Sequence, residues 1–133
     1  MGQSPQAGVE HVVRRFVAAI NRRDLDALAA LMTPDHVFVD GGGARMSGRE
    51  AMKAAWAAYF NIVPDYEVLI EEIYLDGPRA VLLGTARGSY AGEPWRTPAA
   101  WRAVERDGLI AEWRVYCDNE PIRKLIARRA VSE

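Results

Sequence analysis

The sequence predicts an α+β fold, in which a curved, cone-shaped antiparallel sheet wraps around N-terminal helices and encloses a pocket. The first observation behind this prediction is that apolar residues repeat at helical spacing through most of residues 9 to 60. The second is that residues 66 to 117 are rich in β-branched and aromatic side chains and are interrupted by short turns. Because the helices precede the strands instead of alternating with them, the two kinds of element should form separate layers.

Three helices are expected in the first half of the chain. The first carries one apolar stripe, made of Val9, Val12, Val13, Phe16, Val17 and Ile20. Asp24 is suited to cap a short second helix, which Pro34 should end. Ser47, followed three residues later by Glu50, forms a capping-box pattern that opens the third helix. That helix should end at the sequence IVPD, residues 62–65.

The segment HVFVD, residues 36–40, is predicted to be a short strand, and four longer strands should follow the third helix. Turn sequences DGP, AGEP and RDG separate these four strands, which favours an antiparallel meander. The four strands are YEVLIEEIYL (66–75), RAVLLGTARGSY (79–90), RTPAAWRAVER (96–106) and LIAEWRVYC (109–117). A last helix is expected in DNEPIRKLIARR, residues 118–129, because Pro121 suits the first turn of a helix and arginine suits the last.

Length and composition limit the class of protein. A chain of 133 residues, half of them apolar, is expected to form a single domain over residues 1–133 with a core from about 9 to 127. The single cysteine, Cys117, cannot form an internal disulfide, and the first residues lack the pattern of a signal peptide, so a cytoplasmic location is expected. No apolar run approaches the roughly 20 residues that cross a bilayer. Seventeen basic residues nearly balance eighteen acidic ones, which argues against binding to nucleic acid or to anionic membranes.

A sheet that curls around a helix can leave a cavity with apolar walls, which is how small-molecule sites are usually built. Seven aromatic residues are candidates for these walls: Phe16, Phe38, Trp56, Tyr59, Phe60, Trp101 and Trp113. The alternative is that the same rings fill the core and leave no space. Four tryptophans and five tyrosines favour a pocket, because they provide more aromatic surface than packing requires.

Three local sequences carry a resemblance to a known family, and together they span residues 9 to about 127. They are VVRRFVAAINRRDLDALAALMTPDHVFVD at the front, NIVPDYEV in the middle and GLIAEWRVYCDN near the end. With the order of elements, they resemble the nuclear transport factor 2-like superfamily, whose fold is also described as cystatin-like, and within it the SnoaL-like group. The resemblance implies the cone-shaped fold. It does not select one activity, because this fold hosts isomerases, polyketide cyclases, epoxide hydrolases, dehydratases and binding modules.

The resemblance extends only partly to the catalytic residues of ketosteroid isomerases. In those enzymes the carboxylate that ends the short strand is the general base, and the matching position here is Asp40. Phe16 stands where they place an oxyanion-stabilising tyrosine, and their protonated aspartate falls near Ala99 or Ala100. The resemblance therefore implies a base without either oxyanion donor, which argues against ketosteroid isomerisation itself.

Two other mechanisms of the superfamily are also interrupted. The catalytic aspartate of SnoaL-type cyclases matches Val115. The aspartate–arginine–aspartate set of limonene epoxide hydrolases matches Val115, Thr85 and Arg87, so an arginine is present but not at the arginine's own position. Similarity to the epoxide hydrolases further implies that Trp113, Val115 and Cys117 face the interior.

Asp40 is the leading candidate for a catalytic residue. Alternation along a strand puts His36, Phe38 and Asp40 on one face, so a cavity lined by Phe38 should also receive the two polar side chains. A carboxylate in such a site suits a base that takes a proton from the carbon next to a carbonyl group. The alternative is that Asp40 accepts hydrogen bonds from backbone amides of the GGG turn that follows. His36 either moves a proton or orients Asp40, or it is a partly exposed strand residue.

Thr85 and Arg87 alternate onto one face of a long strand. Arg87 either points inward, toward an anionic substrate or Asp40, or is a solvated strand arginine. The sequence GGGARMSG, residues 41–48, has the glycine content of a phosphate-binding loop but lacks its lysine and hydroxyl residue. It is therefore interpreted as a mobile rim of the pocket.

These features predict a protein that binds a small molecule. The expected activity is that of a cofactor-independent isomerase, cyclase or lyase. Asp40 is the expected base, and Arg87 and His36 are further catalytic candidates. Its ligand should be apolar or should contain a carbonyl group. The alternatives are a binding or accessory module without chemistry and a pure interaction domain. No metal or other cofactor is expected, because the two histidines are far apart and no metal-ligand spacing is present.

A homodimer is also expected. An open sheet with apolar outer positions cannot leave both faces in water, so the sheet faces of two copies should pair. The outer positions assigned for this contact are Leu69, Ile73 and Leu75.

Overall fold

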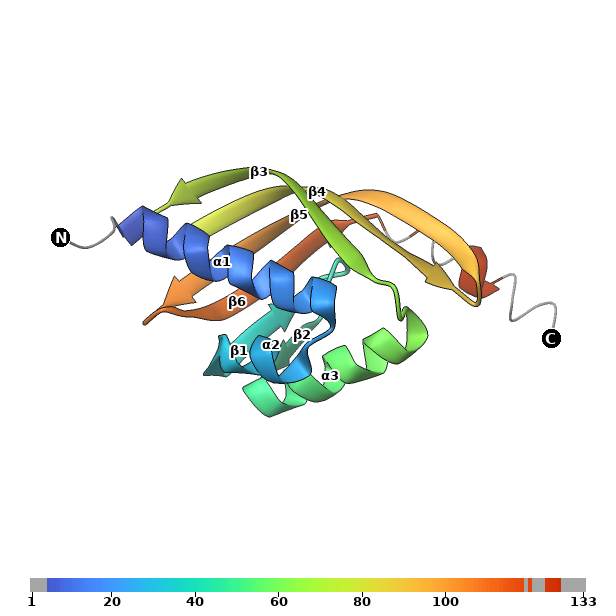
Figure 1. Cartoon of the computed structure of the whole chain (residues 1–133), viewed down its shortest axis with the longest axis horizontal. Coiled ribbons are helices and arrows are strands. Elements are labelled where there is room, and N and C mark those ends of the chain that lie inside the picture. The colour runs from blue at the N-terminus through green and yellow to red at the C-terminus, as the bar shows by residue number, and fades with distance from the viewer. Residues whose placement is uncertain (1–4, 119, 121–123, 128–133) are drawn as a thin grey trace.

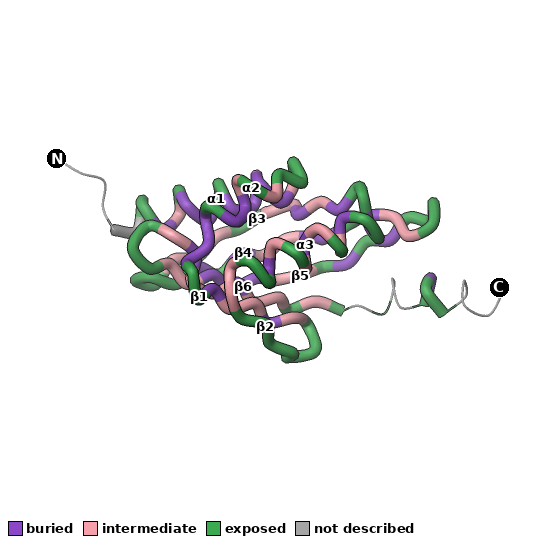
Figure 2. Tube along the Cα trace, turned by 90° about the horizontal axis from the view of Figure 1, so that it is seen from below, coloured by how far each residue is buried: buried purple, intermediate pink, exposed green. Residues whose placement is uncertain are grey.

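The computed structural model describes residues 5–118, 120 and 124–127, and it places helices α1, α2 and α3 against one face of a six-stranded sheet (Figure 1). The helices span Pro5–Arg22 (α1), Leu25–Ala30 (α2) and Arg49–Ile62 (α3). The strands span Met32–Val39 (β1), Arg45–Ser47 (β2), Glu67–Asp76 (β3), Arg79–Tyr90 (β4), Glu93–Arg106 (β5) and Leu109–Cys117 (β6). Figure 2 shows the helices together on one side of the curved sheet, so the predicted α+β class is confirmed.

The sheet has the strand order β2-β1-β6-β5-β4-β3. The predicted antiparallel meander is present as β3 to β6. β1 joins it by pairing in parallel with β6, which the sequence did not predict because the two strands are far apart in the chain. Since Val39 lies opposite Arg114, this pairing brings the end of β1, and with it Asp40, beside the middle of β6.

β1 is longer than the predicted short strand and is followed by a second strand. It begins at Met32, so α2 already ends at Ala30, and Pro34 lies within the strand instead of ending the helix. Pro34 is exposed where the pairing of β1 with β6 is irregular, a place that tolerates a residue without a backbone N–H. Beyond the GGG turn, β2 pairs antiparallel with β1 and completes a hairpin.

α3 begins differently from the capping-box prediction. Ser47 belongs to β2, Gly48 is the N-cap residue, and no side chain caps the helix. Gly48 has a φ of 104°, a conformation that favours glycine. The backbone N–H of Gly48 donates to the carbonyl of His36 at 2.7 Å, and the Arg49 guanidinium donates to the carbonyl of Met32 at 2.6 Å. These two bonds fix the start of α3 to β1.

The other helix predictions concern α2 and the end of the chain. Asp24 caps α2 as predicted, since the backbone N–H of Ala27 donates to its carboxylate at 3.1 Å. Of the predicted last helix, residue 120 and residues 124–127 are helical. The remainder of that helix, which includes Pro121, lies outside the described residues. Within the described part of the chain, no helix has the length and apolar character needed to span a membrane.

The core under α1 is filled with aromatic rings. The predicted apolar stripe of α1 is buried, and the ring centre of Phe16 lies 4.8 Å from that of Trp113. Trp101 stacks against Trp113 with ring centres 6.4 Å apart. None of these three side chains is more than 1% exposed, so this end of the fold leaves no space for a ligand. We call it the filled end.

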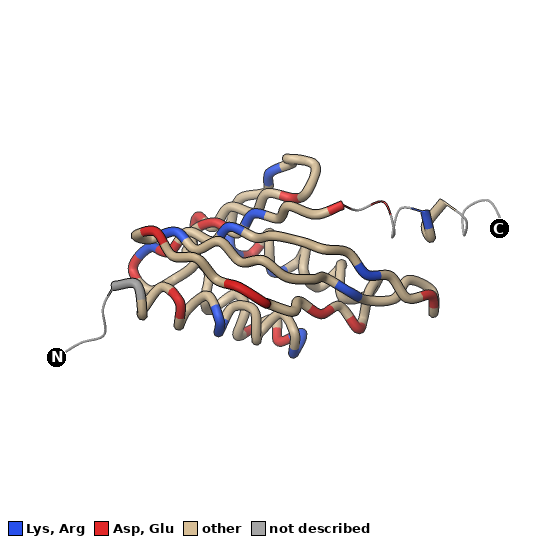
Figure 3. Tube along the Cα trace, turned by 90° about the horizontal axis from the view of Figure 1, so that it is seen from above, with Lys and Arg blue, Asp and Glu red and all other residues tan. Residues whose placement is uncertain are grey.

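The outer face of the sheet is more polar than the sequence predicts. Ile73 and Leu75, assigned to this face, pack against the core instead. The reason is a register shift between Ile70 and Glu72 in the pairing of β3 with β4, because a bulge exchanges the two faces of the strand beyond it. Charged residues of both signs are interspersed over the face shown in Figure 3. The homodimer stays a prediction, without the support of these two residues.

Candidate functional site

A cavity of about 340 Å³ lies between α3 and strands β1, β4, β5 and β6. Its volume is at the lower end of the range of about 300–1,000 Å³ that is usual for small-molecule sites. Most of its wall is apolar or aromatic and comes from Phe38, Met46, Met52, Ala55, Trp56, Tyr59, Tyr66, Ala86, Trp95 and Val115. The other side chains with polar or sulfur atoms in the wall are Asp40, Arg45, Thr97 and Cys117. We call this part of the molecule the hollow end.

The space at the hollow end depends on small side chains and on an anchored helix. Ala55 on α3 and Ala86 on β4 both line the cavity and take little of its volume. The start of α3 is fixed to β1 by the contacts of Gly48 and Arg49 described above. After the end of α3, Val63 lies so close to β4 that a Cβ atom on Gly88 would be only 2.4 Å from its side chain. α3 therefore spans the cavity between two anchors.

Asp40 follows β1 directly and lines the cavity. One carboxylate oxygen, Oδ1, accepts hydrogen bonds from the backbone N–H groups of Gly42 at 2.8 Å and Ala44 at 2.9 Å. The backbone N–H of Asp40 donates to the carbonyl of Ala44, which closes the turn. The other oxygen, Oδ2, makes no hydrogen bond to a described residue. The turn thus holds one oxygen of the carboxylate in place and leaves the other available.

Tyr59 on α3 and Tyr66 just before β3 place two phenol groups in the cavity wall. Their rings meet edge to face, with ring centres 5.1 Å apart. Burial, together with the nearby Cys117, raises the pKa of Tyr59 to about 12. Burial also raises the pKa of Tyr66, and Tyr59 adds to this effect. Both phenols are therefore neutral near pH 7 and can donate a hydrogen bond.

The remaining polar groups of the wall are mainly donors. The indole nitrogens of Trp56 and Trp95 are buried and have no hydrogen-bond partner among the described residues. Burial raises the pKa of the Cys117 thiol, with further contributions from Asp118 and Asp40, so the thiol keeps its proton near pH 7. Among the described residues, no three His, Cys, Asp or Glu side chains gather in a way that suits a metal ion.

The structure brings only some of the predicted pocket residues together. Those that line the cavity are Phe38, Trp56, Tyr59 and Val115. Phe16, Trp101 and Trp113 lie at the filled end instead. Phe60 packs against Trp56, with ring centres 5.4 Å apart, but does not line the cavity. The predicted aromatic set is thus divided between the two ends of the fold.

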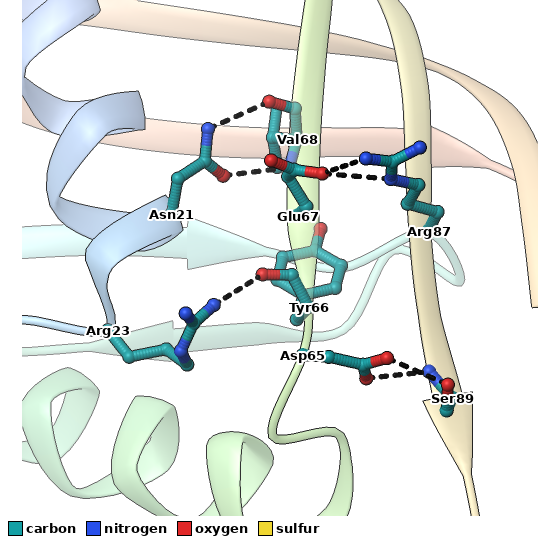
Figure 4. A network of polar contacts seen from close by, with 8 residues as sticks. All are labelled: Asn21, Arg23, Asp65, Tyr66, Glu67, Val68, Arg87 and Ser89. Carbon is teal, nitrogen blue, oxygen red and sulfur yellow. Dashed lines mark hydrogen bonds and ion pairs between the residues drawn. The ribbon is translucent and has the colours of Figure 1, made fainter. Parts of the chain in front are cut away.

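Thr85 and Arg87 lie on the face of β4 opposite the cavity, because Ala86, between them, lines it. The guanidinium group of Arg87 donates to the Glu67 carboxylate on the neighbouring strand at 2.8 Å, and this pair is exposed (Figure 4). Arg87 therefore corresponds to the solvated alternative and does not contact Asp40.

His36 is a core residue at the filled end and is not partly exposed. Its Nδ1 atom donates to the carbonyl of Ile110 at 2.7 Å, and its Nε2 atom has no partner among the described residues. The ring centres of His36 and Phe16 are 6.0 Å apart. Burial is the main reason that the pKa of His36 is lowered, so the ring is neutral near pH 7. No hydrogen bond joins His36 to Asp40.

The sequence interpretation missed Tyr66 and Trp95, which both line the cavity. Trp95 was missed because the predicted strand began at residue 96, whereas β5 begins at Glu93 and places Trp95 on the same face as Thr97. Tyr66 is the first residue of the predicted strand 66–75, so alternation placed it on the same face as Val68. In the structure β3 begins only at Glu67, but the side chains of Tyr66 and Val68 are both buried.

Comparison with known protein families gives one match for this sequence. Residues 13–113 match the family described as SnoaL-like domain. The matched range begins within α1 and ends within β6, so it includes both the filled end and most of the cavity wall. No curated protein matches the chain.

Solved structures confirm the fold. An LEH-like epoxide hydrolase from M. tuberculosis is 22% identical, with 97% of this chain and 96% of that chain covered and a TM-score of 0.82. A proposed SnoaL-like polyketide cyclase from Jannaschia sp. CCS1 is 20% identical, with 93% and 95% covered and a TM-score of 0.82. A protein with a ketosteroid isomerase-like fold from Catenulispora acidiphila, solved with trimethylamine, is 26% identical, with 79% and 83% covered and a TM-score of 0.73.

Proposed function

We propose that this chain, which belongs to the family of SnoaL-like domains, binds a neutral carbonyl compound in the cavity and removes a proton from the carbon next to its carbonyl group. Asp40 is the general base in this proposal. The observation that carries it is the position of Asp40, because among the described residues that line the cavity it is the one carboxylate. The largely apolar wall suits an uncharged ligand with about one or two rings.

The proposed reaction balances without a cofactor. Oδ2 of Asp40 takes the proton, the electron pair of the C–H bond forms a carbon–carbon double bond, and the carbonyl oxygen becomes an enolate oxygen. Return of the proton to a different carbon completes an isomerisation. Alternatively, the enolate carbon attacks a second carbonyl group, and the alkoxide that forms takes the proton back from Asp40, which completes a cyclisation. The two amide bonds to Oδ1 keep the carboxylate in one orientation during the transfer.

Deuterium exchange tests the proposal without knowledge of the natural substrate. We expect the protein to accelerate deuterium incorporation at the carbons next to the carbonyl group of bicyclic ketones, such as 2-acetonaphthone and 2-tetralone, in D₂O. Asp40→Asn keeps the size and the amide-accepting oxygen of the side chain but removes the base. The exchange rate should fall by about 100-fold or more, the scale of general-base catalysis. Mass spectrometry of the recovered ketone measures the rate.

Asp107→Asn is the matched control, since Asp107 is an exposed carboxylate in the turn between β5 and β6. This variant should exchange the ketone at the wild-type rate. An Asp40→Asn protein that retains the wild-type rate would remove Asp40 from the chemistry.

A second candidate function is a binding module that holds an apolar ligand without reaction. It is favoured by Phe16 and by Ala99 and Ala100, which leave the positions of the ketosteroid isomerase oxyanion donors without a donor side chain. In this case 2-acetonaphthone should change the tryptophan fluorescence on binding, because Trp56 and Trp95 line the cavity. Deuterium exchange should then be no faster than in buffer.

A further inference from the structure

We infer that the hydroxyl groups of Tyr66 and Tyr59 form a hydrogen-bond donor site for a carbonyl oxygen of the ligand. This inference rests on the proposed function, because it takes the ligand to be a carbonyl compound. It adds the residues that bind the carbonyl oxygen. The ligand class becomes narrower as well: a neutral ring compound whose oxygen accepts hydrogen bonds.

The first support is a largely buried tyrosine whose hydroxyl group has no hydrogen bond to a described residue. Tyr66 is only 7% exposed and lines the cavity. Its ring is enclosed by other aromatic rings, with centres 5.1 Å from Tyr59 and 6.2 Å from both Trp56 and Trp95. Its hydroxyl group makes no hydrogen bond to a described residue, although its backbone is fully engaged. The hydroxyl group of a buried tyrosine normally makes a hydrogen bond. We therefore expect it to donate one to an acceptor atom of the ligand.

The second support is the rigid position of Tyr66. The Arg23 guanidinium donates to the Tyr66 carbonyl at 3.1 Å, and the Tyr66 backbone N–H donates to the carbonyl of Val63 at 3.2 Å. At the start of β3, the Asn21 side chain both accepts from and donates to the backbone of Val68, at 2.8 and 2.9 Å (Figure 4). The end of α1 and the residue that follows it thus hold the backbone around Tyr66 in place. A preorganised donor binds a developing oxyanion better than a mobile one.

The third support is the chemical character of the cavity. Both phenols stay protonated near pH 7, because burial raises the pKa of each. Asp40, the one carboxylate among the described lining residues, comes from the turn after β1, whereas the phenols come from α3 and the segment before β3. Base and donors therefore come from different elements that line the same cavity. A ligand rich in donors, such as a sugar, finds few acceptors in this wall.

The inferred site replaces donors that the family resemblance placed elsewhere. Phe16 and Ala99 or Ala100 occupy the positions of the isomerase donors, and Phe16 is buried at the filled end. Tyr59 and Tyr66 supply the same kind of group from a different part of the wall.

Two probes of matched shape test the inference. 2-Acetonaphthone carries a carbonyl oxygen, and 2-isopropenylnaphthalene has a CH₂ group in its place. We expect the wild-type protein to bind the ketone about tenfold more tightly than the hydrocarbon, the scale of one good hydrogen bond. The infrared stretch of a carbon-13-labelled carbonyl group should move to lower frequency on binding, because donors weaken the C=O bond.

Tyr66→Phe should remove most of the preference for the ketone over the hydrocarbon and most of the infrared shift. Tyr59→Phe should remove part of each. The affinity for the hydrocarbon should stay within about twofold, since phenylalanine keeps the ring. Tyr116→Phe is the matched control, because Tyr116 lies on β6 but is 46% exposed and does not line the cavity. It should behave as the wild type in both measurements.

The inference is overturned if both Tyr→Phe variants retain the full preference and the full infrared shift, or if the wild type binds neither probe. Its failure is distinguishable from failure of the proposed function. An infrared shift that disappears in Tyr66→Phe supports the donor site even when no deuterium exchange occurs. Exchange that depends on Asp40 but not on either tyrosine supports the base and overturns the donor site.

Discussion

The filled end and the hollow end lie under one continuous sheet, yet one is packed and the other surrounds a cavity. At the filled end, Phe16 from α1 inserts against Trp113, and both rings are almost completely buried. At the hollow end, Ala55 of α3 and Ala86 of β4 line the cavity together with the larger rings of Trp56 and Tyr66. The difference lies in which helix covers the sheet and in where its large side chains fall.

This comparison shows that aromatic content alone does not define a ligand site. Both ends contain tryptophan rings in contact with other rings. Unpartnered polar atoms do not separate the two ends either. Among the described residues, Nε2 of His36 and the indole nitrogen of Trp101 lack partners at the filled end, as do the indole nitrogens of Trp56 and Trp95 at the hollow end. The cavity itself is what distinguishes the hollow end. Stability should therefore be concentrated at one end and binding at the other.

The largest effect should come from emptying the filled end. Phe16→Ala removes a fully buried ring, so the free energy of unfolding should fall by about 3–5 kcal/mol. Phe38→Ala should cost less than half as much, because Phe38 is only partly buried and already borders the cavity. Urea denaturation of both variants measures the difference. Equal losses would mean that the hollow end is packed as tightly as the filled end.

Filling the cavity should separate binding from stability. Ala86→Leu places extra volume in the cavity, so the affinity for 2-acetonaphthone should fall by about tenfold or more, with a change in unfolding free energy below about 1 kcal/mol. Ala80→Leu makes the same change on the same strand at the filled end, where Ala80 is fully buried. It should cost about 1–3 kcal/mol through overpacking. The reverse pattern, with Ala86→Leu the more destabilising variant, would contradict an open cavity.

Alkaline pH should weaken the hollow end. In the unfolded chain a tyrosine loses its proton near pH 10, whereas in the folded protein Tyr59 holds it to about pH 12. Between these values the folded state binds more protons, so the free energy of unfolding falls as the pH rises, by up to about 1.4 kcal/mol per pH unit for each such group. Tyr59→Phe should flatten the stability profile above pH 10, as measured by urea denaturation at several pH values.

Acid should also lower the free energy of unfolding, through His36 at the filled end, by an amount no larger than the alkaline effect. The pKa of His36 is lowered in the folded protein, mainly by burial, so the unfolded chain takes up a proton more readily below its usual value of about 6.5. The free energy of unfolding should therefore fall as the pH drops below about 6.5, with a slope of up to about 1.4 kcal/mol per pH unit. His36→Asn keeps a donor for Ile110 and cannot titrate. An unchanged slope in this variant would exclude His36 as the cause.

Several features of this protein follow from the sequence alone, because they depend on neighbours along the chain. Each of these features depends on residues only two to four positions apart. They are the apolar stripe of α1, the cap at Asp24 and the four strands of the meander. The family resemblance, which also predicted the cone-shaped fold, is a property of such local sequences. The position of Asp40 at the end of a strand, followed by a turn that binds its carboxylate, could likewise be expected from DGGG.

Other features were decided only by the tertiary structure, because they depend on distances between elements that are far apart in the chain. The parallel pairing of β1 with β6 brings Asp40 to the cavity, and the bulge in β3 turns Ile73 and Leu75 inward. Whether a ring fills the core, as Phe16 does, or borders a cavity, as Tyr66 does, depends on the gap between a helix and the sheet. Periodicity fixes the direction of a side chain relative to its own element, but it contains no information about how far away the opposite wall lies.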